Sequence, residues 1–168
     1  MLSFLFKSKQ RRTYFERLEQ APQLIDLHIV SLPQTISKKY EEVLDLVPRH
    51  WDVVLNVVAV FLFSELMLNM KSITESDKEI LSRKSLAYVK NKYGNIAIAY
   101  HGNYAKFMLD TGRMRPELTS DNIMIIWMCR TFSESDEVSQ RLVEMMTITH
   151  SMLMYALADL MGLEFRKT

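Results

Sequence analysis

The stretch from His50 to Met70 constrains the fold of this chain more than any other. It reads HWDVVLNVVAVFLFSELMLNM, and Asn56 is its only polar residue between Val53 and Phe63. An apolar run of this kind between charged segments forms either the central helix of a core or a membrane contact. It is too long for a strand, since strands rarely exceed about ten residues. We therefore expect one helix over this stretch.

Polar residues inside the stretch argue against a transmembrane span. A spanning helix needs about 20 predominantly apolar residues, and a carboxylate within the bilayer costs about 3 kcal/mol. We therefore predict a core helix and no transmembrane span. The interrupting residues are Asp52, Asn56, Ser64, Glu65 and Asn69.

Composition predicts an all-α fold. Four glycines and four prolines in 168 residues are few, and sheet proteins need such residues for their turns. The single cysteine, Cys129, lies in the apolar run NIMIIWMC, which excludes a disulfide framework and favours a buried thiol in a reducing compartment. We predict an arm over residues 1–12 and one domain over residues 13–168, a helical bundle of about six or seven helices around two long apolar ones.

Prolines mark the expected boundaries in the first third of the chain. A helix from Arg12 to Gln20 is predicted to end at Pro22. The segment Gln23–Leu32 has the pattern of either a short helix or a short strand. Pro33 suits the first turn of a further helix, which Pro48 would close.

Capping patterns predict the start of the next helix. Thr74 with Asp77, or Ser76 with Glu79, fits a capping box, and Gly94 would end the helix after Tyr93. Its expected inward residues are Ile80, Leu81, Ala87 and Tyr88.

Three more helices are predicted towards the C-terminus. The residues before Gly112 have helical spacing, although Ile96–Tyr100 alone would also suit an extended segment. A helix over Asn122–Phe132 would be capped by residue 119, 120 or 121. The segment Asp136–Met161, with Gly162 after it, is the second long apolar helix, and we expect it to pack with the first.

Motifs for catalysis and cofactor binding are missing from the sequence. The four histidines lack the spacing of helical metal sites, and no nucleophile elbow or glycine-rich phosphate loop is present. We therefore predict no catalytic residue, no metal site and no cofactor. An enzyme with a polar pocket around Tyr100, His101, Asn103 and Tyr104 is an alternative with no motif behind it.

A basic, tyrosine-rich segment over residues 78–106 suggests one kind of partner. Residues 71–115 contain nine basic and four acidic side chains, whereas residues 116–165 contain two and eight. Cations neutralise phosphates while tyrosines stack on bases, so the segment suits a nucleic acid or another anionic ligand. The candidate residues are Lys84, Tyr88, Lys90, Lys92, Tyr100, His101, Tyr104 and Lys106.

Methionine enrichment suggests another kind of partner. Twelve methionines are present, and exposed methionines form adaptable apolar surfaces for partner helices. Our leading hypothesis is therefore a non-enzymatic interaction module, such as an adaptor, inhibitor or chaperone-like factor, that binds another protein or a second copy of itself. A nucleic-acid-associated regulator is the alternative. The candidate partner-binding residues are Met145, Met146, Met152 and Met154.

The N-terminal arm places Leu2, Phe4, Leu5 and Phe6 before four basic residues. This order is the reverse of a secretory signal. It suits either a segment packed into the core or a peripheral contact with an anionic membrane through residues 2–12. We expect a cytoplasmic protein that is able to make such a contact.

Overall fold

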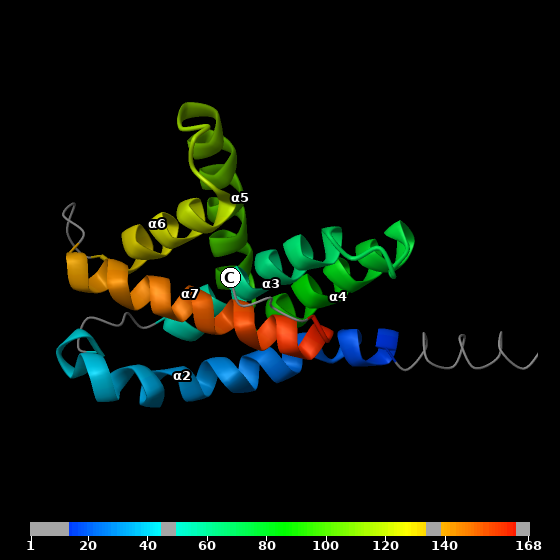
Figure 1. Cartoon of the computed structure of the whole chain (residues 1–168), viewed down its shortest axis with the longest axis horizontal. Helices are drawn as coiled ribbons and strands as arrows, with labels where there is room; N and C mark the ends of the chain where they lie inside the picture. Colours follow the sequence, from blue (N-terminus) through cyan, green and yellow to red (C-terminus); the bar gives the residue numbers. More distant parts are fainter. Residues whose placement is uncertain (1–13, 45–49, 134–138, 164–168) are drawn as a thin grey trace, which may run out of the picture.

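The computed structural model describes residues 14–44, 50–133 and 139–163, and for residues 33–44 the backbone alone. All the regular structure in these residues is helical, which confirms the predicted all-α bundle (Figure 1). A helical stretch at residues 14–19 leads into the first labelled helix. The labelled helices are α2 (Ala21–Leu44), α3 (Trp51–Leu68), α4 (Glu75–Tyr93), α5 (Asn95–Met114), α6 (Ser120–Phe132) and α7 (Gln140–Met161).

Helix α3 lies at the centre of the bundle, as predicted. Every residue from Val53 to Val60 is buried, so all sides of the helix are covered. It contacts α2, α4, α5 and α7. Among the described helices, α3 is the one that is long and apolar enough to cross a membrane, and 67% of it is buried inside the fold. This burial is that of a core helix, which needs neighbours on every side.

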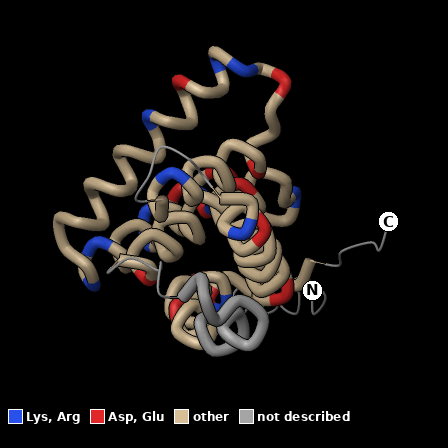
Figure 2. The backbone as a smooth tube through the Cα atoms, turned by 90° about the vertical axis from the view of Figure 1, so that its left-hand side faces the viewer, with Lys and Arg blue, Asp and Glu red and all other residues tan. Residues whose placement is uncertain are grey.

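The remaining helices form the layers around α3. Helices α2 and α7 lie side by side, and α6 packs on α7 (Figure 1). Phe132 at the end of α6 reaches Trp51 at the start of α3, with 5.0 Å between ring centroids. This contact joins α6 to α3 as well as to α7. Helix α5 contacts α3, α4 and α6 but projects away from the other helices, as the view turned by 90° also shows (Figure 2).

Side-chain caps set the beginnings of three helices. Thr74, Thr119 and Ser139 each accept a hydrogen bond from a backbone N–H in the first turn of α4, α6 and α7. Gly94 (φ +64°) and Gly162 (φ +69°) end α4 and α7 in a conformation that side chains disfavour. The predicted residues Thr74, Gly94 and Gly162 are confirmed. Helix α7, predicted from Asp136, begins at Gln140 with Ser139 as its cap, and residues 134–138 lie outside the described residues.

Several predicted boundaries are wrong. Helix α2 continues through position 33, so Pro33 does not open a separate helix and Gln23–Leu32 is not a strand. Helix α5 continues past Gly112 to Met114, and Ile96–Tyr100 is helical. Local signals are overridden here because packing against neighbouring helices stabilises the longer helix. Pro48 lies outside the described residues.

The buried face of α4 also differs from the prediction. Leu81 is buried as expected, but Ala87 is exposed, while Ile80 and Tyr88 are half-buried. The buried positions belong instead to Lys78, Leu81, Ser85 and Val89. This face contains two polar residues, so counting apolar positions could not identify it.

Candidate functional site

An open groove lies between α5 and α6, where α5 leaves the body of the bundle. Its volume is about 600 Å³. Five α5 residues recur at helical intervals along one side, so the sequence itself aligns them on one face of the helix. Residues of the last two turns of α6 form the other side. The lining residues are Ile96, Ala99, Tyr100, Asn103 and Phe107 from α5, and Trp127, Arg130 and Thr131 from α6.

Trp127 forms a rigid part of the groove. It is 2% exposed, and its Nε1 donates a hydrogen bond to Oδ1 of Asn103 at 2.9 Å. Its ring lies 4.9 Å from that of Tyr104 and 6.4 Å from that of Tyr100, measured between centroids. Because the indole is held by aromatic neighbours and a hydrogen bond, a ligand would not need to order it on binding.

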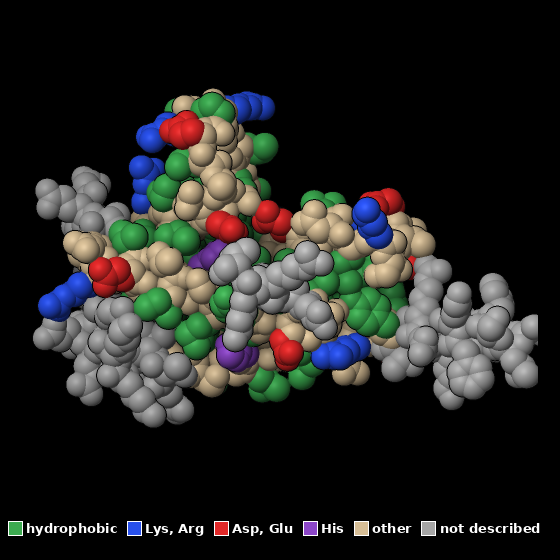
Figure 3. Space-filling view, in the orientation of Figure 1, with side chains coloured by type: hydrophobic (Ala, Val, Ile, Leu, Met, Phe, Trp, Pro, Cys, Tyr) green, Lys and Arg blue, Asp and Glu red, His purple; other side chains and the backbone are tan. Residues whose placement is uncertain are grey.

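One exposed apolar side chain lies beyond the groove, at the tip of α5. Met114 lies seven residues after Phe107, which is two helical turns along the same face, and it is 71% exposed. The space-filling view shows apolar side chains together with Lys and Arg side chains on this projecting helix (Figure 3). Exposed apolar residues that adjoin an apolar groove are typical of protein interaction sites.

Basic residues border the groove. The Arg130 guanidinium lies 5.4 Å from the centroid of the Phe107 ring, a cation–π contact that holds it at the edge of the groove. Lys106 and Arg113 are exposed and lie one above the other on α5, seven residues apart. Asp110 is the acidic residue on this side of α5. The border is therefore mainly positive.

The basic, tyrosine-rich residues predicted as an anion site are split up by the fold. Lys84 forms an ion pair with Glu19. Tyr88 and Lys92 both donate to the buried carboxylate of Asp26. Tyr104 is fully buried. These four side chains therefore do not form one open surface.

Asp26 is the acceptor at the centre of this network. It is 5% exposed, and Tyr88 Oη and Asn56 Nδ2 each donate to it at 2.9 Å, with Tyr93 Oη at 3.2 Å. Burial alone would raise the pKa of the Asp26 carboxyl, but the hydrogen bonds from Lys92, Asn56 and Tyr88 outweigh it and leave the pKa lowered. Burial and the same carboxylate raise the pKa of Tyr88 to about 12. The network therefore joins α2, α3 and α4 structurally.

The other predicted anion-site residues have separate surroundings. Tyr100 lines the groove. The His101 ring stacks on Phe61 with 4.7 Å between centroids, and burial lowers the pKa of His101. Lys90 and Lys106 are exposed on different helices.

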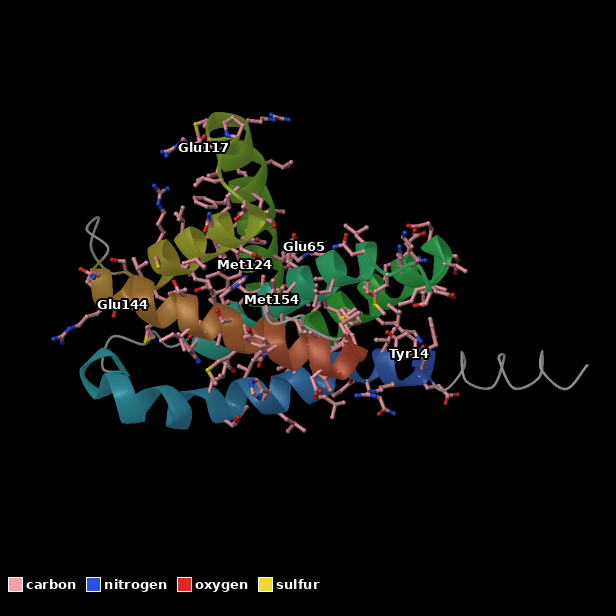
Figure 4. The ribbon with its side chains drawn as sticks, in the orientation of Figure 1. Tyr14, Glu65, Glu117, Met124, Glu144 and Met154 are labelled. Atoms are coloured by element: carbon pink, nitrogen blue, oxygen red, sulfur yellow. The ribbon has the colours of Figure 1, made fainter. Side chains whose placement is uncertain are left out.

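The four candidate methionines of α7 divide into two pairs. Met145 and Met146 are 1% and 0% exposed and belong to the core. Met152 and Met154 are half-buried and pack against that core, and Figure 4 labels Met154 on α7. The large exposed apolar side chains on α7 are instead Val143 and Tyr155.

Sequence reasoning missed Phe107, Trp127 and Arg130 as site residues. The helical spacing of Ile96, Tyr100 and Phe107 was visible, but spacing alone predicts only that such residues share a face. Whether that face turns towards a core or towards a groove depends on how far α6 covers α5.

The fold and the groove define the class of this protein as an all-α bundle with an open apolar groove beside a projecting helix. Within the described residues, no three His, Cys, Asp or Glu side chains converge to hold a metal ion. No protein-family model matches the chain, and no match is found among the curated proteins or the solved structures compared with it.

Proposed function

We propose that this chain is a non-enzymatic protein-interaction module that binds a helical segment of a partner protein in the groove between α5 and α6. The observation that carries the proposal is the groove itself, with a volume of about 600 Å³ and aromatic side chains from both helices. An amphipathic helix binds such a groove through apolar residues on one face.

Charge supports a partner segment with acidic residues. Arg130 lines the groove, and Lys106 and Arg113 are exposed on α5, against one nearby carboxylate on that helix, that of Asp110. Complementary charge at the border of an interface increases the rate of association and selects the orientation of binding. An acidic amphipathic helix therefore fits this groove better than a basic one.

The burial of Met145 and Met146 moves the proposed surface from α7 to α5. Buried side chains contact a partner only if the core opens, which costs much of the stability of a small domain. The hypothesis of an adaptor, inhibitor or chaperone-like factor is unchanged, but the residues that support it are those of the groove. A second copy of this chain is a competing occupant that the experiment below distinguishes.

The alternative, a nucleic-acid-associated regulator, has less support. Lys84, Tyr88 and Lys92 are already engaged by carboxylates of this chain, which leaves fewer cations to neutralise phosphates. A filter-binding titration with single-stranded RNA over increasing salt measures the alternative directly. Affinity that falls steeply with salt would favour it, since phosphate contacts release counterions.

We also propose where the protein is located. We propose a cytoplasmic protein whose residues 2–12 are able to contact an anionic membrane, and these residues lie outside the described part of the chain. Sedimentation with anionic vesicles, before and after deletion of residues 2–12, tests the membrane contact.

Site-specific photo-crosslinking tests the groove. A photoreactive phenylalanine analogue at Met114 is compared with the same analogue at Leu68, since these two apolar side chains are 71% and 69% exposed and lie on different helices. We expect a crosslinked partner at Met114 that is absent at Leu68 and is lost when Phe107→Ala or Arg130→Glu is added. A crosslink to a second copy of this chain would indicate self-association. Equal crosslinking at both positions would contradict a docking site in the groove.

A further inference from the structure

Polar side chains of three helices meet at a second place, which we call the junction site: Glu65 of α3, Asp121 of α6 and His150 of α7. We include Tyr104 of α5 in the junction site because both carboxylates act on its hydroxyl and raise its pKa. His150 Nε2 lies 3.2 Å from Asp121 Oδ1. Ser120 Oγ donates to Glu65 Oε1 at 2.6 Å, which ties the start of α6 to α3. Figure 4 labels Glu65 near the crossing of these helices, and Figure 3 shows acidic side chains beside a histidine near the middle of this face.

Two of these side chains are buried without a hydrogen-bond partner among the described residues. They are the Tyr104 hydroxyl and His150 Nε2, in residues that are 0% and 5% exposed. Nε2 lies 3.2 Å from Asp121 Oδ1, but the contact lacks the alignment of a hydrogen bond. Each unpartnered buried group costs about 1–3 kcal/mol, and folded proteins seldom keep one without a reason.

The carboxylates of the junction site also lack a cation. No Lys or Arg among the described residues forms an ion pair with Glu65 or Asp121. His150 is the basic group that lies 3.2 Å from Asp121, and burial lowers its pKa, although Asp121 and Glu65 act in the opposite direction. Burial and the same two carboxylates raise the pKa of Tyr104. Two carboxylates therefore face an imidazole whose pKa is lowered and a phenol whose pKa is raised.

A metal ion is a poor match for this arrangement, because no three metal-ligating side chains converge among the described residues. An ammonium group is a better one. It provides three N–H donors on one atom, and carboxylates and a neutral imidazole nitrogen all accept such bonds. The Asp121 side chain is half exposed, so its carboxylate lies at the surface of the junction site.

We propose that the junction site binds a primary ammonium group, with Glu65 and Asp121 neutralising its charge and the unpartnered His150 Nε2 and Tyr104 hydroxyl completing its hydrogen bonds. The ammonium belongs either to a free amine or to a lysine side chain of another protein. The proposal does not depend on the groove, since it rests on the four residues of the junction site.

Titration with methylammonium chloride, at constant ionic strength against sodium chloride, tests the proposal by NMR of the histidine rings. We expect a saturating shift of the His150 signals in the intact protein. Asp121→Asn and Glu65→Gln should each weaken the affinity by about tenfold or more, as expected for loss of a hydrogen bond to a charged group. Asp110→Asn, an exposed acidic residue of α5, is the matched control and should change nothing. A shift that never saturates, or equal affinity in Asp121→Asn, would overturn the proposal.

Tyr104→Phe separates binding from folding, because it removes only the unpartnered hydroxyl. We expect weaker methylammonium binding with no loss of thermal stability. A lowered melting temperature would show instead that the hydroxyl has a structural partner.

Two further titrations identify the source of the cation. Tighter binding of Nα-acetyl-lysine amide than of methylammonium would indicate a lysine side chain, and the reverse would indicate a free amine. Saturation by magnesium chloride with no response to either amine would overturn the ammonium assignment.

Discussion

At the scale of single residues, buried polar groups differ in whether other residues of the chain provide their hydrogen-bond partners. Asp26 is surrounded by donors from α3 and α4. Tyr104 and His150 are equally buried but have no such partners among the described residues. A satisfied buried network stabilises one arrangement of helices, whereas an unsatisfied group lowers stability and points to a ligand. Asp26 is therefore assigned a structural role and the junction site a binding role.

Replacing Asp26 should destabilise the protein in a pH-dependent way. Asp26→Asn removes the charge that Lys92 and the two tyrosines of α4 depend on, and we expect a loss of about 2–4 kcal/mol near pH 7. The folded-state pKa lies below the ordinary value of 3.8, so the stabilisation is present above that value and is lost as pH falls through the folded-state pKa. Urea denaturation of both proteins over a range of pH measures the difference. Asp110→Asn is the exposed control, and a gap that widened in acid would contradict this role for Asp26.

At the scale of the helices, caps were the most reliable sequence signal and prolines the least. A cap satisfies backbone groups within a few residues, so its pattern is complete in the local sequence. A proline only weakens a helix by a fixed amount, which packing of the whole helix is able to offset. Thr74 and Pro33 illustrate the two cases.

Thr74→Ala tests the cap of α4. Thr74 Oγ1 accepts from the Asp77 N–H at 3.2 Å and donates to Asp77 Oδ2 at 2.7 Å. We expect a loss of about 1 kcal/mol in the free energy of unfolding, measured with urea. Ser76→Ala, in the same turn, should have a smaller effect. Equal losses in the two variants would mean that the alternative capping box, Ser76 with Glu79, is formed.

Pro33→Ala should stabilise the protein. Within the uninterrupted helix α2, a proline lacks the backbone N–H that would bond to the carbonyl of Ile29. We expect a gain of about 2 kcal/mol, somewhat less than the full cost of proline in a helix interior. Thermal unfolding followed by circular dichroism measures it. A destabilised variant would contradict this account, because it would show that the helix requires a proline at position 33, as it would if α2 were broken there.

At the scale of the whole molecule, burial is uneven between the central helix and the projecting one. Helix α3 is covered on every side, whereas α5 contributes only Ala97 and Tyr104 as fully buried residues. Local stability follows burial, so the tip of α5 should open more easily than the centre of α3. A site on the less covered helix is free to adapt to a partner.

Native-state hydrogen exchange should reveal this difference. We expect the amides of Val54–Val58 to exchange only through global unfolding, and those of Leu109–Met114 to exchange through local opening. The measurement is the slope of exchange free energy against denaturant, which should be steep for α3 and shallow for the tip of α5. Similar slopes for both would mean that α5 unfolds only with the rest of the bundle.

Sequence alone determined the fold class, the central helix over His50–Met70 and the caps at Thr74 and Gly162. These features depend on composition and on residues a few positions apart, which a single chain displays directly. Tertiary structure alone decided that Asp26 accepts hydrogen bonds from Tyr88 and Lys92, that Met145 and Met146 face the core, and that α5 and α6 leave a groove between them. It also brought together Glu65, Tyr104, Asp121 and His150, which are separated by 17 or more positions in the sequence. Such groupings depend on which faces of distant helices meet, and a helical pattern specifies the spacing of a face but not its neighbour.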